Sequence, residues 1–264
     1  MIEQQEPEEL RTTVCGCDTY VLRSGKGPTV LYLHGDRGGS EWTTILQRLA
    51  TNFDVVAPDH PGMGHSSSPD WIDNIHDMAY FYLQLIKALD LRDVHVIGSS
   101  LGGWIAMEMA VRSTERLRSL TLVGTTGIYL DGTDLPDQFL MTNEELVRTL
   151  FVDQSRADVI LATPQTDEQM DRFLRNRHIS ARLGWTPRFH DPHLEKWLPT
   201  VDIPTLIGWG RHDALFPVTY GERLAKLFPN SELTIFENSG HLPQVEEAER
   251  FSIVFEQFTR GVQS

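Results

Sequence analysis

The sequence predicts an α/β fold: a mostly parallel sheet of eight strands, doubly covered by helices, with a helical segment inserted after the sixth strand. Short apolar runs alternate with helical periodicity before residue 127 and again after residue 198, which is typical of a parallel sheet. Between them the chain is polar and helix-prone, and no run resembles a buried strand. We therefore expect a core domain of residues 1–126 and 199–264 and a helical cap, or lid, of residues 127–198.

The elements before the predicted cap follow a regular order. Residues 1–10 are interpreted as a frayed tail, and two β-like runs, Thr12–Cys15 and Thr19–Arg23, come next. The continuous apolar run Thr29–Leu33 suits a strand that is buried on both faces. The further elements expected are a helix over Trp42–Thr51, a strand over Phe53–Ala57, an amphipathic helix over Asn74–Leu89, a strand over Val94–Ile97, a helix over Gly102–Val111 and a strand over Leu120–Val123.

The alternation resumes after the predicted cap. A strand is expected over Thr205–Trp209, a helix near Tyr220–Leu227, a strand over Glu232–Phe236 and a final helix over Glu246–Phe258. A helical insertion between parallel strands is expected to lie over their carboxyl ends. Ligands of open α/β sheets bind at those ends, so the predicted cap would cover the site.

Composition and charge narrow the class of partner. The chain carries 37 acidic against 23 basic residues, a net charge of −14, which repels phosphate backbones and anionic lipid heads. We expect no nucleic-acid partner and no membrane partner. Met1–Leu10 does not resemble a signal peptide, and no apolar run approaches the roughly 20 residues that span a bilayer. Cys15 and Cys17 are expected on one face of a strand as free thiols, which favours a reducing, cytoplasmic location.

The sharpest motif is the run from Gly98 to Gly102, GSSLG, a G-x-S-x-G pattern between an apolar strand and an apolar helix. This setting is typical of a nucleophile elbow, a strained turn that projects a serine hydroxyl from the sheet edge. Glycines on either side let strand and helix approach without a Cβ clash. The new helix also directs its N–H groups and positive dipole end at developing negative charge. Ser100 is therefore the predicted nucleophile.

A serine nucleophile needs a base that accepts its proton and a carboxylate that orients the base. His241 lies among small residues in the loop between the last strand and the last helix, and it is the predicted base. Asp213 follows the strand TLIGW at the carboxyl edge of the sheet and is the predicted carboxylate. Asp131, after the preceding strand, is the alternative acid.

The oxyanion of a tetrahedral intermediate needs two backbone N–H donors. One is expected from Leu101, which directly follows the predicted nucleophile. The other is expected from the loop after the strand TVLYL, which reads HGDRGG from His34 to Gly39. Within this loop the N–H of Asp36 is the predicted donor, and that of Arg37 is the next candidate.

Five motifs, in this order, resemble those of the α/β-hydrolase superfamily: LHGDRGG, PDHPGMGHS, GSSLGG, WGRHD and SGHLPQVE. The chain is similar to carboxylesterases and to the meta-cleavage-product hydrolases, which break carbon–carbon bonds, with enol-lactonases close by. Ser100 departs from related dehalogenases and epoxide hydrolases, which have aspartate there. The carbon–carbon hydrolases usually have a proline in the loop after His-Gly and a tryptophan after the catalytic histidine. This chain has Arg37-Gly38-Gly39 and Leu242-Pro243 instead.

The resemblance implies a serine hydrolase that cleaves an ester, or a related acyl bond, through an acyl-enzyme intermediate. Carbon–carbon bond hydrolysis and enol-lactone hydrolysis are the alternatives within enzymes. From another class, a ligand-sensing protein without turnover is a further alternative. The expected partner is a small-molecule ester or ketone, no cofactor is required, and a homodimer is common for this architecture.

Substrate contacts are expected from large apolar side chains, namely Trp104, Phe139, Trp185 and Leu242. The run His190–His193, HDPH, resembles a fragment of a metal site. A proline-containing loop of the cap is the better interpretation of this run, and no metal site is expected.

Overall fold

An eight-stranded sheet forms the centre of the computed structural model, which describes residues 6–39 and 41–262. The strand order is β1-β2-β4-β3-β5-β6-β7-β8. The first two pairings, β1 with β2 and β2 with β4, are antiparallel, and every later neighbour is parallel. The predicted fold class is therefore confirmed. The strands are β1 (Glu8–Val14), β2 (Cys17–Ser24), β3 (Thr29–Leu33), β4 (Asp54–Pro58), β5 (Val94–Ser99), β6 (Leu117–Val123), β7 (Thr205–Gly210) and β8 (Ser231–Phe236).

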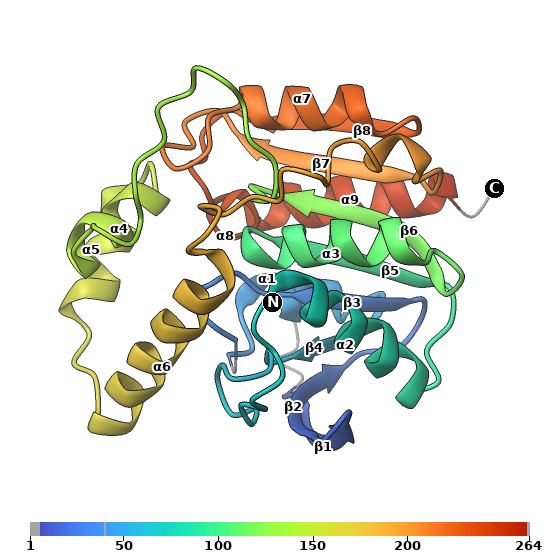
Figure 1. Ribbon diagram of the computed structural model, residues 1–264, viewed down its shortest axis with the longest axis horizontal. Coiled ribbons are helices and arrows are strands. Elements are labelled where there is room, and N and C mark those ends of the chain that lie inside the picture. Colours follow the sequence, from blue (N-terminus) through green and yellow to red (C-terminus); the bar gives the residue numbers. More distant parts are fainter. Residues whose placement is uncertain (1–5, 40, 263–264) are drawn as a thin grey trace.

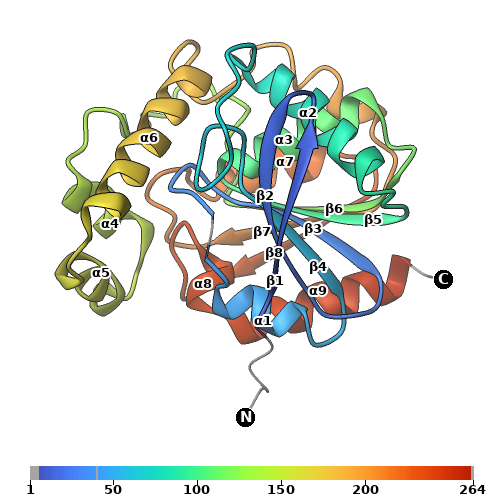
Figure 2. The same ribbon diagram turned by 90° about the horizontal axis from the view of Figure 1, so that it is seen from below.

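Helices cover both faces of this sheet (Figure 2). One face carries α2 (Ile75–Ala88), α3 (Leu101–Arg112) and α7 (Thr219–Leu227), and the other carries α1 (Thr44–Leu49), α8 (Pro243–Glu246) and α9 (Ala248–Val262). Every residue of β5 and β7 is buried, which explains why these strands contain few polar residues. On the α9 side, Phe251 and Phe255 pack on strand residues such as Val30 and Ile97. Burial of each phenylalanine contributes roughly 1.5–3 kcal/mol.

The chain between β6 and β7 forms three helices, which lie together at one side of the sheet in Figure 1, and a short 3-10 turn beside α3. These are α4 (Asn143–Leu150), α5 (Gln154–Ala162), α6 (Asp167–Gly184) and η1 (Leu198–Thr200). Capping boxes begin α4 at Thr142 and α6 at Thr166, where each threonine accepts a hydrogen bond from the third helical N–H. We refer to residues 127–198 as the helical insertion.

Two predictions for the N-terminal region are wrong. Residues 8–10 are not a frayed tail but the start of β1, which pairs with β2 from Glu8 onward, while residues 1–5 lie outside the described residues. Cys15 does not share a strand face with Cys17, because it lies in the hairpin turn with a φ of +50°. Both cysteines are free thiols, as predicted, with Cys15 exposed and Cys17 buried. Within the described residues, no helix has the length and apolar character needed to cross a membrane.

Candidate active site

Ser100 lies on a strained turn between the end of β5 and the start of α3. Its backbone angles are φ +52° and ψ −116°, a conformation that residues with a side chain rarely adopt. The turn depends on its glycines: a Cβ on Gly98 would lie 2.4 Å from the carbonyl oxygen of Gly102, and one on Gly102 would lie 2.2 Å from that of Leu33. The side chain of Ser100 is held at the carboxyl end of the sheet, as the motif predicts.

His241 and Asp213 form a buried pair beside this turn. Nδ1 of His241 lies 2.9 Å from Oδ2 of Asp213, and both residues are almost inaccessible to solvent. The other carboxylate oxygen, Oδ1, accepts the backbone N–H groups of Leu215 and Phe216, each at 2.9 Å. An ionised carboxylate only accepts, so Nδ1 carries the proton and Nε2 is left with its lone pair. Asp131, the alternative acid, lies exposed in a turn after β6 and does not make this contact.

The electrostatics of His241 suit a general base. Burial works to lower its pKa, but the Asp213 carboxylate raises it by charge and by hydrogen bonding, and the Asp36 carboxylate adds to this. The net result is a pKa above the ordinary histidine value of 6.5. Gly124 makes room for the ring, since a Cβ there would lie 3.2 Å from Nδ1 of His241.

The loop after β3 approaches the serine turn closely. A Cβ on Gly35 would lie 3.3 Å from the Cβ of Ser100. The carbonyl of Gly35 accepts the N–H of Gly38 at 3.2 Å and faces Nδ1 of His34 at 2.7 Å. Because the C=O and N–H of a trans peptide point in opposite directions, the N–H of Asp36 points away from both groups. The N–H of Leu101 is in the first turn of α3, where it has no partner within the helix.

Two buried histidines, His34 and His60, hold this loop through hydrogen bonds. Nε2 of His34 accepts the backbone N–H of His60 at 3.0 Å, so its Nδ1 carries the proton and donates to Gly35. His60 in turn donates from Nε2 to the carbonyl of His34 at 2.8 Å and accepts the Tyr82 hydroxyl at Nδ1. Burial lowers the pKa of both rings, so they remain neutral supports of the loop.

Ser100 and His241 both line a cavity of about 490 Å³ between the core and the helical insertion. Asp36 and Leu242, two further predicted site residues, line it as well. The insertion contributes one wall: Leu150, Ile160, Thr163, Pro164, Gln165, Gln169, Arg172, Phe173 and Asn176. A volume of this size fits the range of small-molecule sites.

The aromatic residues predicted to bind substrate are placed differently from one another. Phe139 lines a small neighbouring cavity of about 10 Å³, room for about one water molecule. Trp104 and Trp185 line neither cavity: Trp104 is buried on α3 and donates to Glu108 at 3.2 Å, and Trp185 is half exposed. Arg37, whose N–H is the alternative predicted oxyanion donor, lines both cavities.

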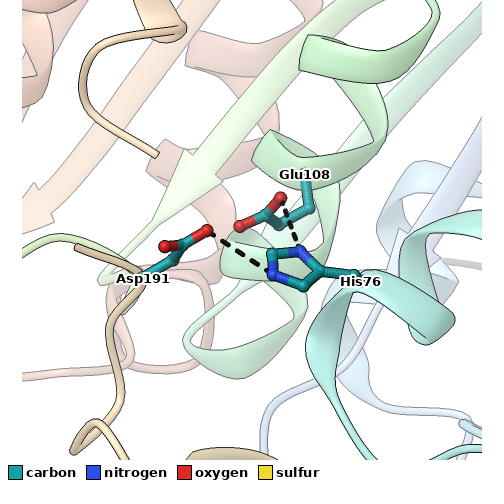
Figure 3. Close-up of side chains that lie close together, drawn as sticks. All are labelled: His76, Glu108 and Asp191. Atoms are coloured by element: carbon teal, nitrogen blue, oxygen red, sulfur yellow. Dashed lines mark hydrogen bonds and ion pairs between the residues drawn. The ribbon is translucent and has the colours of Figure 1, made fainter. Parts of the chain in front are cut away.

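A second cluster of polar side chains joins α2, α3 and the end of the insertion (Figure 3). Nδ1 of His76 lies 3.3 Å from Glu108, and its Nε2 lies 3.7 Å from Asp191, a spacing that metal ligands also have. However, Arg112 donates to Oε2 of Glu108 at 2.5 Å and to Nδ1 of His76 at 2.7 Å. The guanidinium thus provides the positive charge that balances Glu108, and we interpret the cluster as an ion-pair network.

Comparison with known proteins agrees with this architecture. The sequence pattern of the alpha/beta hydrolase family matches residues 30–252. With a mostly parallel sheet covered by helices on both faces, the fold is that of an α/β-type hydrolase. The chain belongs to the alpha/beta hydrolase family.

Individual relatives include two curated hydrolases. The chain is 28% identical to the 2-hydroxy-6-oxo-6-(2'-aminophenyl)hexa-2,4-dienoic acid hydrolase of Metapseudomonas resinovorans, with 90% of this chain and 86% of the relative covered. It is 26% identical to the 2-hydroxymuconate semialdehyde hydrolase of Pseudomonas sp. strain CF600, with coverage of 94% and 93%. A crystal structure described as a membrane phospholipase A superposes with a TM-score of 0.81 at 26% identity, covering 98% of this chain and 87% of that one. Family and relatives support hydrolase activity.

Proposed function

We propose that this protein is a serine hydrolase that cleaves an ester, or a related acyl bond, of a small molecule through an acyl-enzyme intermediate. The observation that carries the proposal is the buried contact between Nδ1 of His241 and Oδ2 of Asp213, 2.9 Å long, at a histidine that lines one cavity together with Ser100. This pair leaves Nε2 of His241 free to accept the serine proton.

The reaction follows from these positions. Oγ of Ser100 attacks the carbonyl carbon while its proton passes to Nε2 of His241. The negative charge on the carbonyl oxygen is stabilised by the N–H groups of Leu101 and Asp36. His241 then gives its proton to the leaving alcohol, and water repeats the sequence to release the acid. Asp213 holds the imidazole in one tautomer throughout.

In this proposal the helical insertion, residues 127–198, acts as a lid on the core of residues 1–126 and 199–264. The support for a lid is the wall that residues of α5 and α6 provide in the cavity that Ser100 also lines. Such a wall sets the size of the acyl group that is accepted and limits water at the reacting carbonyl.

Hydrolysis of p-nitrophenyl esters of increasing acyl length tests this proposal. We expect wild-type activity with a preferred chain length, and at least a 10³-fold loss in Ser100→Ala. Ser99→Ala is the matched control, because the neighbouring hydroxyl binds Nε2 of Gln244 at 2.9 Å instead of facing the His–Asp pair. Equal activity in wild type and Ser100→Ala, or none in either, would refute ester hydrolysis by this serine.

One observation favours a second candidate, hydrolysis of a carbon–carbon bond in a dienoic acid. Nη1 of Arg37 is buried and has no hydrogen-bond partner within the described residues. Nη2 donates to Asn143 at 3.3 Å, and the guanidinium lies over the ring of Phe173. Burial lowers the pKa of Arg37, because the charged guanidinium loses hydration that the protein does not replace in full. A substrate carboxylate would stabilise this cation.

The second candidate is tested with 2-hydroxymuconate semialdehyde, the substrate in the name of the Pseudomonas relative. Arg37→Met is expected to lower kcat/KM for this acid by about 10- to 100-fold, since a hydrogen bond to a charged group contributes roughly 1.5–3 kcal/mol. Activity on p-nitrophenyl acetate should stay within about twofold of wild type. Arg177→Met, which changes a neighbouring arginine of the small cavity, is the control. Equal losses on both substrates would contradict a carboxylate site at Arg37.

A further inference from the structure

Helix α6 of the insertion is hydrogen-bonded to the loop that carries the proposed oxyanion donor. The hydroxyl of Ser180 donates to the carbonyl of Asp36 at 3.2 Å, and Nδ2 of Asn176 donates to the carbonyl of Arg37 at 3.1 Å. Both side chains are buried, and they lie four residues apart, on the same face of the helix. Two successive carbonyls of the loop are therefore held by side chains of one helix.

The backbone of the loop is shaped for this contact. Gly38 has a φ of +112°, and a Cβ there would lie 2.2 Å from Nδ2 of Asn176. A side chain at position 38 would thus push Asn176 away from the Arg37 carbonyl. Oδ1 of Asn176 accepts the N–H of Gly64 at 3.1 Å, so the same amide also joins a second core loop.

The two ends of the loop have different supports. The carbonyl of Gly35 is held from within the core, by His34 and Gly38. The next carbonyls, those of Asp36 and Arg37, are held by α6. Because a peptide group is planar, a bond to its oxygen also sets the direction of its N–H. The N–H of Asp36, the proposed oxyanion donor, belongs to the peptide plane that the core holds, and the next plane, which carries the N–H of Arg37, is held by the insertion.

We propose that Ser180 and Asn176 are positioning residues, which hold the oxyanion loop in its reactive conformation from the insertion. This inference rests on the proposed function, because an oxyanion must form for the loop to matter. In it α6 does more than form a wall of the cavity: it holds the two peptide planes that follow the N–H of Asp36, so the loop keeps its reactive conformation only while the insertion is seated on the core. The contacts of Ser180 and Asn176 with the loop then contribute to stabilisation of the transition state but not to binding of the substrate.

The test compares Ser180→Ala and Asn176→Asp with wild type on one p-nitrophenyl ester and one trifluoromethyl ketone. The ketone adds Oγ of Ser100 to its carbonyl carbon, its oxygen becomes an oxyanion, and the serine proton moves to His241, so its affinity reports on the oxyanion donors. Ser180→Ala removes one oxygen atom. Asn176→Asp keeps the acceptor for Gly64 and loses the donor to Arg37.

We expect each variant to lower kcat and the affinity for the ketone by about tenfold and to leave KM within about twofold of wild type. This loss in kcat is smaller than the 10²–10³-fold loss that follows removal of an oxyanion donor itself. Ser180→Thr, which keeps the hydroxyl, should restore both values. The control is Arg182→Met, which removes another bond from α6 to a core carbonyl, that of Asp70 at 2.8 Å, and should change neither.

Two results would overturn the inference alone: variants that match Arg182→Met, or a fall in kcat with unchanged ketone affinity. A wild type that neither hydrolyses esters nor binds the ketone would overturn the proposed function and this inference with it. The unfolding temperature of each variant separates these outcomes from a loss of folded protein.

Discussion

Replacing Asp213 by asparagine should inactivate the enzyme without removing its fold. Oδ1 of Asp213 accepts two backbone N–H groups at 2.9 Å, from Leu215 and Phe216. An asparagine must keep its oxygen on these donors, because its NH₂ group would repel them. The NH₂ group therefore faces His241, where Oδ2 now accepts from Nδ1 at 2.9 Å.

The consequence is a change of tautomer. With a donor opposite, Nδ1 of His241 becomes the acceptor and the proton moves to Nε2, which then has no lone pair for the Ser100 proton. A tautomer change of this kind costs about 10⁴-fold in kcat, and each factor of ten corresponds to about 1.36 kcal/mol, so the loss is about 5.4 kcal/mol in the activation free energy.

The assay is steady-state hydrolysis of a p-nitrophenyl ester by Asp213→Asn, with Asp131→Asn as the control. Asp131 is exposed in its turn, and its replacement should leave kcat/KM within about twofold, as is usual for surface changes. The unfolding temperature of Asp213→Asn should remain near that of wild type, because both backbone hydrogen bonds to Oδ1 persist. Retention of more than a tenth of wild-type activity in Asp213→Asn would refute this reasoning.

Two further predictions concern the surroundings of His241. The pKa of His241 is raised above 6.5 in part by the Asp36 carboxylate, so activity should rise with pH as the imidazole loses its proton. Asp36→Asn should move this acid limb of the kcat/KM profile to lower pH. An acid limb at the same pH in the variant would contradict the effect of the Asp36 charge. Gly124→Ala would put a Cβ 2.6 Å from the carbonyl oxygen of His241 and should lower kcat/KM more than tenfold. Gly132→Ala is the control, because Gly132 also has a positive φ but a Cβ there would have no atom within 4 Å. This variant should retain activity, which would show that the loss in Gly124→Ala comes from displacement of His241 and not from backbone strain alone.

Local sequence signals were sufficient for the core strands and for the serine turn. Strands buried on both faces, such as β5 and β7, contain few polar residues, so their apolar runs are visible without knowledge of the fold. The elbow at Ser100 is also local, because glycines are needed on either side of the turn. The strand–turn–helix order and the glycines of the elbow are both visible in one short run of sequence, although Gly102 also makes room for the distant carbonyl of Leu33.

Features that depend on distant neighbours were harder to predict. The start of β1 at Glu8–Leu10 is polar on average, and it becomes a strand because β2 supplies its hydrogen-bond partners. The aromatic type of Trp104 suggests a substrate contact, but α3 is buried on nearly all sides, so periodicity does not show which face of the helix meets the cavity. The contacts of Asn176 and Ser180 with the oxyanion loop join residues more than a hundred positions apart, beyond the reach of local patterns.

The most direct test of the account is to find which residue becomes covalently modified by a fluorophosphonate, which reacts with activated serine hydroxyls. The protein would be treated with the reagent, digested and analysed by mass spectrometry, beside Ser100→Ala and Ser99→Ala. We predict one adduct, on Ser100, in wild type and in Ser99→Ala, and none in Ser100→Ala. An adduct on another residue, or an unmodified Ser100 in folded wild-type protein, would contradict the claim that His241 and Asp213 activate this serine.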